Sequence, residues 1–340
     1  MTKQDIEAAK SFEELHANVL SFFSELVAEL GGDSEKLLHQ IGISAEQAPI
    51  TYRQLVGLLE LAAAHLHCPD FGMRLAVRQK IIPSYGPLGA VMKNSKTYGD
   101  ALNYVSSHAY AHSLAAQVRL TRLGSEQGIF AAHDILIDGM PDKSQAIEQI
   151  LLLGQLGASE LTGGYAKARK VHFRHQPVSP LRLYRRYFGC EVCFGQDEDG
   201  LFYSDSDVAC PVIDNDAEAY EIAISFIDEE FARQRPPIHA EVRGVILRFL
   251  GAKECTREDA AAELNLHLRT LHRRLAAEGT SFQKIKDELR RDLMLYYLTR
   301  TALSFARITE KLGFAEQAIL TRTCQRWFNR TPTMLRREGH

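Results

Sequence analysis

Cysteine, proline and tryptophan are scarce in this 340-residue chain, which has 6, 11 and 1 of them respectively. Long hydrophobic runs are missing: no stretch approaches the roughly 18 apolar residues that a membrane-spanning helix needs. The first ten residues, MTKQDIEAAK, also lack the basic-then-apolar order of a secretion signal. These absences argue against a membrane span, and we expect a cytoplasmic protein without a membrane partner.

The six cysteines are too scattered to form a disulfide framework or a zinc site. Only Cys190 and Cys193 stand close together, as a C-x-x-C. This pair falls in a predicted strand, where positions three apart point to opposite faces. No second pair completes a metal site. We therefore expect buried free thiols, no bound metal and no cofactor.

The charge of the chain is unevenly distributed. Residues 236–340 carry 19 Lys and Arg against 12 Asp and Glu, a net charge of +7, whereas residues 1–235 carry −10. The length and the apolar content of 45% suffice for two domains, each with its own core. A basic C-terminal third joined to an acidic remainder is typical of a nucleic-acid-binding module carried by a regulatory domain.

A first helix-turn-helix unit is predicted at about 256–277. A short helix over 257–264 is followed by a second helix over about 268–278, on which Leu271 and Leu275 lie four apart and form the buried face. The opposite face is either a solvated polar surface or a surface that reads DNA. The predicted base contacts are Arg269, His272 and Arg273, with Arg274 assigned to phosphate.

A long amphipathic helix that Ser281 can cap is predicted after this unit. Its apolar stripe consists of Ile285, Leu289, Leu293 and Tyr296 or Tyr297. Its basic face holds Lys284, Lys286, Arg290 and Arg291, which either touch phosphate or only solubilise the helix. Of these, Lys284 is the predicted phosphate contact. The helix is the natural spacer between two DNA-binding units.

A second unit repeats the scheme at about 304–328. A supporting helix over 304–312 is followed by a turn at Gly313 and a second helix over 316–328, with Leu320 and Trp327 facing inward. The predicted base contacts on this helix are Gln317, Ile319 and Arg322, and the predicted phosphate contacts are Arg326 and Arg330.

These motifs carry a resemblance to a known family. The stretch 303–336, with LGF, LTRT, QRW and an Asn-Arg-Thr-Pro turn, resembles the signature of the AraC/XylS family of bacterial transcription regulators. The stretch AAELNLHLRTLHRRLAAEGTSF resembles that family's first helix-turn-helix. The resemblance implies two recognition helices, held by a linking helix, that enter successive major-groove segments of promoter DNA. It also implies RNA polymerase as a partner.

Four residues depart from the family pattern. His267 stands where a Ser cap is usual, Thr309 replaces a small Ala, and Leu320 and Cys324 replace two Phe residues. The last three lie in the second unit, so we expect looser packing there. The sensor domain would then adjust the docking of that unit.

Residues 1 to about 112 are predicted to be helical, with helices at 12–30, 52–67 and 98–112. A mixed α/β portion follows. Its predicted elements are strands at 116–123 and 129–137, a helix at 144–161, a strand at 170–174, a helix at 181–188, and strands at 191–194 and 201–203. The predicted fold is an α+β N-terminal domain followed by an all-α C-terminal domain.

The N-terminal portion resembles the sensor domain of the ornithine and arginine regulators within the same family. The matching pieces are 70–75, 86–89, 187–195 and the region of Pro211. The resemblance implies a ligand-sensing domain without the cupin-like barrel of the arabinose regulator. The candidate effector-binding residues are Tyr85, Tyr110, Arg182 and Arg186. Binding of a metal ion by His108 and His112 is the less favoured interpretation, because no third ligand is suitably spaced in the sequence.

An acidic helix at 214–237, ended by Arg235-Pro236-Pro237, is predicted to link a sensor domain at 1–213 to a DNA-binding domain at 238–340. Its apolar stripe packs either on its own domain or on a second subunit, and a homodimer is the favoured hypothesis.

The leading hypothesis is that the protein is a transcription factor controlled by a small-molecule effector, and not an enzyme. Activation is the more common role in the family. One alternative is a DNA-directed alkyl-transfer repair enzyme, which would need an activated cysteine. The other is a regulator controlled by a protein partner.

Overall fold

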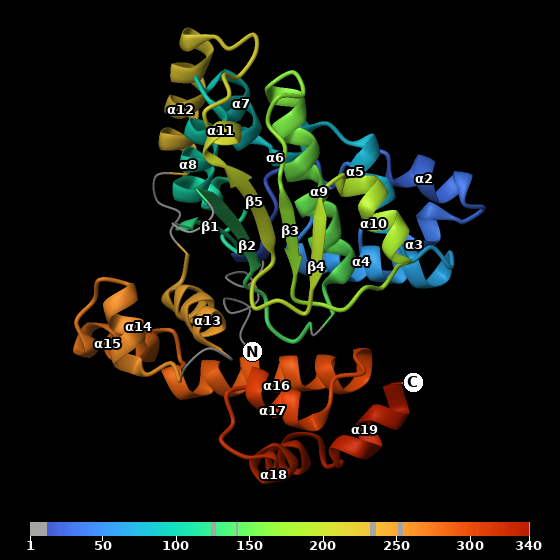
Figure 1. Cartoon of the computed structure of the whole chain (residues 1–340), viewed down its shortest axis with the longest axis vertical. Coiled ribbons are helices and arrows are strands. Elements are labelled where there is room, and N and C mark those ends of the chain that lie inside the picture. The colour runs from blue at the N-terminus through green and yellow to red at the C-terminus, as the bar shows by residue number, and fades with distance from the viewer. Residues whose placement is uncertain (1–11, 124–126, 141, 232–235, 251–253, 340) are drawn as a thin grey trace. The chain divides into compact units, whose positions relative to one another are not determined.

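A computed structural model describes residues 12–123, 127–140, 142–231, 236–250 and 254–339 (Figure 1). The chain divides into two compact units. The N-terminal unit comprises Met1–Ile135 and Lys143–Arg235, and the C-terminal unit comprises Leu136–Asp142 and Pro236–His340. In the part of the chain that the structure describes, no helix has both the length and the apolarity needed to cross a bilayer.

The N-terminal unit begins with helices. They are α2 (Phe23–Glu29), α3 (Ser34–Gln40), α4 (Tyr52–His65), α5 (Phe71–Arg78), α6 (Ile81–Tyr85), α7 (Pro87–Asn94), α8 (Tyr98–His108) and the 3₁₀ turn η1 (Ala109–Ala111). Capping boxes start α4 and α8: the hydroxyls of Thr51 and Thr97 accept the N–H groups of Gln54 and Asp100. The predicted helix at 98–112 is therefore real but changes to a 3₁₀ turn after His108.

The predicted helix at 12–30 is wrong over residues 14–22, because only Phe12 and Glu13 are helical before regular helix begins again at Phe23. The backbone upstream makes hydrogen bonds to distant segments: the N–H groups of Leu15, His16 and Asn18 donate to the carbonyls of Ile50, His112 and Pro83. These tertiary bonds take the donors that a helix would use. The local amphipathic pattern could not reveal them.

A five-stranded sheet forms the middle of the N-terminal unit. Its strands are β1 (Ala116–Leu123), β2 (Gly128–Ile135), β3 (Lys170–Phe173), β4 (Glu191–Phe194) and β5 (Gly200–Ser204). Their order is β1-β2-β5-β3-β4, antiparallel except for the parallel pair β3–β4. This open sheet agrees with the expectation of an α+β domain without a barrel. The predicted strand at 129–137 ends earlier, at Ile135.

Three helices accompany the sheet: α9 (Ser144–Leu161), which packs on β5, α10 (Leu181–Phe188) and α11 (Asp205–Val208). The predictions for α9 and α10 match the observed bounds. Gly189, in the left-handed conformation at φ 64°, ends α10.

The acidic helix α12 (Ala217–Phe231) buries a stripe of Ala223, Ile227 and Phe231 and packs on α7 of its own unit. Two large apolar side chains on it, Ile222 and Phe226, are exposed to 64% and 52%. The helix therefore has a second apolar face that the N-terminal unit does not cover.

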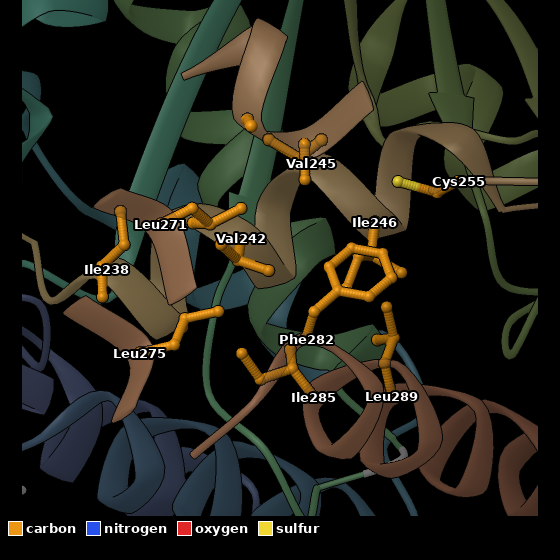
Figure 2. Packing of buried hydrophobic residues seen from close by; sticks show 12 residues of the cluster. Ile238, Val242, Val245, Ile246, Cys255, Leu271, Leu275, Phe282, Ile285 and Leu289 are labelled. Atoms are coloured by element: carbon orange, nitrogen blue, oxygen red, sulfur yellow. The ribbon is translucent and has the colours of Figure 1, made fainter. Parts of the chain in front are cut away.

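The C-terminal unit is helical. Its helices are α13 (Ile238–Phe249), α14 (Arg257–Glu263), α15 (Leu268–Ala277), α16 (Phe282–Arg300), α17 (Phe305–Lys311), α18 (Gln317–Phe328) and α19 (Pro332–Gly339). One hydrophobic core joins α13, α14 and α15 to the first half of α16 (Figure 2). A second core joins α17, α18 and α19 to the second half of α16. Leu293 packs against both cores, so a single helix connects the two helix-turn-helix units.

The segment Leu136–Asp142 groups with this unit although it lies between β2 and α9 in the chain. The N–H of Gly139 donates to the carboxylate of Asp292 on α16 over 3.0 Å, and Asp142 pairs with Arg300 at 3.5 Å. Asp292 also accepts from Arg243 of α13 at 2.8 Å. One carboxylate thus binds both the segment and α13 to α16.

Candidate nucleic-acid interface

The first helix-turn-helix unit is held by a capped helix and a buried stripe. The hydroxyl of Thr256 accepts the N–H of Asp259 at 3.1 Å, which starts α14. Asn265 takes the left-handed conformation, with φ 52°, and makes the turn into α15. Leu271 and Leu275 are fully buried and anchor α15 to the core (Figure 2). The side chain of His267, where a Ser cap is usual, makes no capping hydrogen bond.

The opposite face of α15 is polar and exposed. The predicted base contacts Arg269, His272 and Arg273 and the predicted phosphate contact Arg274 are all exposed. Spacings of three and four residues place Arg269, His272 and Arg273 along one side of the helix. The fold therefore presents a basic surface at this helix, as a major-groove reader requires.

The basic face predicted on α16 is smaller than the sequence suggested. Lys284 and Arg291 are exposed, and the side chain of Ser281 caps the helix as expected by accepting the N–H of Lys284. Lys286, in contrast, is buried and donates to the carbonyl of Cys255 at 2.9 Å. Arg290 donates to the carbonyls of Leu312 and Gly313, each at 2.9 Å. Lys286 and Arg290 are structural because tertiary acceptors engage them.

The second unit follows the same plan. The hydroxyl of Ser304 accepts the N–H of Arg307 and starts α17, and Gly313 makes the turn at φ 63°. Leu320 and Cys324, around which we expect looser packing, are both fully buried in the second core. The hydroxyl of Thr309 donates to the carbonyl of Phe305 at 2.7 Å, so its polar group is satisfied.

The residues of α18 that are predicted to contact DNA are mostly exposed. Of the predicted base contacts, Gln317 and Arg322 are exposed and Ile319 is half-buried. The predicted phosphate contacts Arg326 and Arg330 are also exposed. The guanidinium of Arg326 lies over the Trp327 ring at 5.6 Å, which limits its freedom.

The candidate effector residues do not form one cluster. Tyr85 on α6 is half-buried and lies 6.0 Å from His112, measured between ring centroids, whereas Tyr110 on η1 lies 5.6 Å from His108. Arg182 and Arg186 are exposed on α10, a different element.

The environment of His112 was missed by the sequence reading. His112 is 4% exposed, and neither ring nitrogen has a hydrogen-bond partner among the described residues. Burial lowers its pKa to about 3. Tyr52, at 6.0 Å between rings, and Tyr85 pack beside it. The hydroxyl of Tyr52 also meets the ring of His133 at 3.4 Å. Burial lowers the pKa of His133 to about 4. Local sequence patterns could not indicate this cluster, because its side chains come from four segments far apart in the chain.

The cysteines are free thiols, but only part of the burial prediction is correct. Cys68, Cys255 and Cys324 are buried, whereas Cys190, Cys193 and Cys210 are half-buried because they lie at or near the ends of short surface elements. Burial raises the pKa of Cys68, Cys190 and Cys324 to about 11. Such thiols are protonated at neutral pH and are poor nucleophiles. The described residues contain no group of three or more His, Cys, Asp or Glu arranged to hold a metal ion.

Comparison with known proteins identifies both units. A family model described as "Arabinose-binding domain of AraC transcription regulator, N-term" matches residues 31–212. A second model, described as "Helix-turn-helix domain", matches residues 260–338.

Similarity to named regulators extends along the chain. The "HTH-type transcriptional regulator VirS" of Mycobacterium tuberculosis is 30% identical over 96% of this chain and 97% of its own. The "Ornithine utilization regulator" of Pseudomonas aeruginosa is 24% identical over 91% of this chain and 92% of its own. The crystal structure of the transcriptional regulator CdpR from the same bacterium gives a TM-score of 0.44 at 16% identity, covering 89% of this chain and 96% of that one. Since a family model spans more than half of the chain and a relative at 30% identity spans nearly all of it, the chain belongs to the AraC family of DNA-binding transcription regulators.

Proposed function

We propose that this regulator binds specific promoter sequences through α15 and α18, and that a small-molecule effector held by the N-terminal unit controls it. The amphipathic character of α15 supports the DNA-binding part of this proposal. Leu271 and Leu275 fix the helix in the core, and Arg269 and Arg273 are exposed on the other side. Arg can pair in a bidentate manner with guanine N7 and O6, which gives sequence preference.

The length of α16 supports two contacts on one face of DNA. Its 19 residues span about 28 Å at 1.5 Å per residue. Successive major-groove segments on one face of B-DNA are about 34 Å apart. A helix of this length, packed into both cores, suits a spacer between two recognition helices.

The test compares Arg269→Ala with Arg326→Ala. Genome-wide mapping of bound sites first supplies a cognate duplex. Arg269→Ala should then relax preference at one base position, at a cost of about 1–3 kcal/mol on the cognate duplex alone. Arg326→Ala should weaken binding to cognate and random duplexes alike, because a phosphate contact carries no sequence information. Equal losses on both duplexes for every variant would contradict this assignment of base contacts.

The N-terminal unit supports effector control through its buried polar aromatic cluster of Tyr52, Tyr85, His112 and His133. Imidazole nitrogens and phenol hydroxyls can donate and accept hydrogen bonds, so this cluster offers polar groups to a small molecule that reaches it. Differential scanning fluorimetry of the full chain against a metabolite panel tests this. We expect a metabolite to raise the melting temperature of the wild type, and a smaller rise for His112→Phe. If no small molecule stabilises the protein, control by a protein partner replaces this proposal.

We further propose that the regulator activates transcription with RNA polymerase, and that it acts as a homodimer without catalysing a reaction. The uncovered apolar side chains of Ile222 and Phe226 support the dimer. The raised thiol pKa values oppose the alkyl-transfer alternative. A reporter behind a mapped promoter separates activation from repression: deletion of the regulator should lower expression, and higher expression would indicate a repressor.

A further inference from the structure

A surface cavity of about 540 Å³ lies beside the recognition helix of the first unit. It is bordered by residues 254–258 at the start of α14, by one flank of α15, and by the residues that begin α16. The polar side chains that matter here are Thr256, Arg257, His272, Ser281, Gln283 and Lys286. His272 therefore borders a cavity at the side of α15. Arg269 and Arg273 do not line it.

The cavity contains basic groups that the fold has not engaged. In the described part of the chain, the side chains of Arg257 and His272 form no hydrogen bond or ion pair, and both are exposed. Lys286 lies at the same cavity with its side chain only 6% exposed. Its ammonium donates to the carbonyl of Cys255 at 2.9 Å and to Glu254 at 3.2 Å, which accounts for two of its three protons.

Two carboxylates also line the cavity, and their negative charges offset those of its lysine and arginine. Glu254 is paired with Lys286, so this pair is neutral. Glu258 and Arg257 are both exposed, so water and salt screen their opposite charges alike, and the lining as a whole has no net charge. The guanidinium of Arg257 has no partner among the described residues, so it can donate hydrogen bonds to an anion, and His272 lines the same cavity. The side-chain amide of Gln283 donates to Asp287 at 3.1 Å, whereas its backbone N–H lies in the first turn of α16 and lacks an acceptor within the helix.

We propose that this cavity binds one phosphodiester of the DNA backbone, and that His272 contacts this phosphate instead of a base. The inference rests on the proposed DNA-binding function and revises the sequence-based assignment of one residue. Arg269 and Arg273 then read bases, while Arg257, His272 and Gln283 fix how deeply α15 enters the groove. A phosphate bound beside a recognition helix sets its register and carries no sequence information.

The experiment uses the full chain, a cognate duplex and a random duplex, with affinity measured by fluorescence anisotropy over a range of salt concentrations. Arg257→Ala and His272→Ala should each weaken binding to both duplexes by the same factor, about tenfold, as expected for one lost hydrogen bond to a charged group. Arg257→Ala should also reduce the slope of log affinity against log salt by about 0.9, the value for one neutralised phosphate. Arg337→Ala removes the same charge outside the cavity and serves as the matched control.

Methylphosphonate substitution tests the phosphate itself. Replacing single phosphates of the cognate duplex in turn should reveal one position whose neutralisation weakens the wild type but does not further weaken Arg257→Ala. Loss of base preference in His272→Ala, or additive losses at every position, would overturn the proposal. Saturable binding of inorganic phosphate at this cavity without DNA, seen as a melting-temperature rise lost in Arg257→Ala, would assign it to a free phosphate ligand instead.

Failure of this inference can be told apart from failure of the proposed function. If Arg269→Ala changes base preference while the cavity variants bind like the wild type, only the phosphate site is wrong. If the wild type shows no preference for any mapped sequence, the proposed function itself fails.

Discussion

His112 shows how a single side chain can couple the stability of the N-terminal unit to pH. Its pKa is lowered by burial to about 3, and that of His133 to about 4, whereas an unfolded histidine titrates near 6.5. Between these values the unfolded chain binds protons that the folded chain does not. Stability contributed by the neutral histidines is therefore complete above about pH 6.5 and is lost as the pH falls towards the folded pKa.

We predict that acidification from pH 7 to pH 5 costs the wild-type N-terminal unit about 2 kcal/mol for each of these two histidines. His112→Phe keeps an aromatic ring beside Tyr52 and Tyr85 but cannot take up a proton, so it should remove one of the two contributions. Urea unfolding at both pH values measures this. His65→Gln, at an exposed histidine, is the control and should leave the pH dependence unchanged. A His112→Phe chain that loses as much stability as the wild type would show that His112 is not responsible.

The predicted site residues on α15 and α18 follow from the sequence because helical spacing separates buried Leu from exposed Arg within a few residues. The distinction between Arg290 and Arg291 on α16 does not. Both are basic and adjacent, yet Arg290 reaches carbonyls at the end of α17 while Arg291 is exposed. Those acceptors lie more than 20 residues away in the chain, so local spacing cannot indicate which arginine is structural.

The helix α16 is the element on which the C-terminal unit depends. Its first half contributes Phe282, Ile285 and Leu289 to one core, and its second half contributes Met294, Tyr297 and Leu298 to the other. Arg290 lies between these halves and binds the backbone of the second helix-turn-helix turn. The orientation of the second recognition helix is therefore fixed partly by one guanidinium.

We predict that Arg290→Ala destabilises the C-terminal unit by about 1–3 kcal/mol, because two carbonyls lose a charged donor. Arg291→Ala, the neighbouring exposed position, should cost less, about 0.5 kcal/mol, because it loses only the contact of its guanidinium with the Phe328 ring at 5.5 Å. Thermal unfolding of the two variants measures the difference. DNA footprints should show weaker protection on the side of the second unit for Arg290→Ala only. Similar stabilities for both variants would contradict the structural role of Arg290.

Helices are predicted well where the buried stripe and the residues that end the helix can both be recognised within the helix itself. The helix α9 is correct at both ends, and Gly189 marks the end of α10. The predicted helix at 12–30 fails over residues 14–22 because the backbone there bonds to segments from 50 to 112. Only the tertiary structure supplies those partners.

The two faces of α12 bear on how two copies of the protein assemble. One face is buried on its own unit, and the other exposes Ile222 and Phe226, which are four residues apart and so lie on the same side of the helix. We predict that the chain is a dimer through this face and that Ile222→Glu together with Phe226→Glu makes it monomeric. Sedimentation velocity measures the change.

The control for this variant is Val77→Glu, which places a charge on another apolar side chain, 53% exposed, on α5. It should remain dimeric. The double variant should retain the wild-type circular dichroism spectrum, because neither side chain belongs to the buried stripe. A dimer that survives both substitutions would place the subunit contact elsewhere.

The segment Leu136–Asp142 has a practical consequence for dissecting this protein. The polypeptide passes from one unit to the other after residues 135, 142 and 235, so no single cut separates them. A fragment that starts at Pro236 keeps both recognition helices. It leaves behind Gly139 and Asp142, the partners of Asp292 and Arg300. Truncation would thus yield an incomplete DNA-binding unit, and adding back a peptide of this segment should raise its melting temperature.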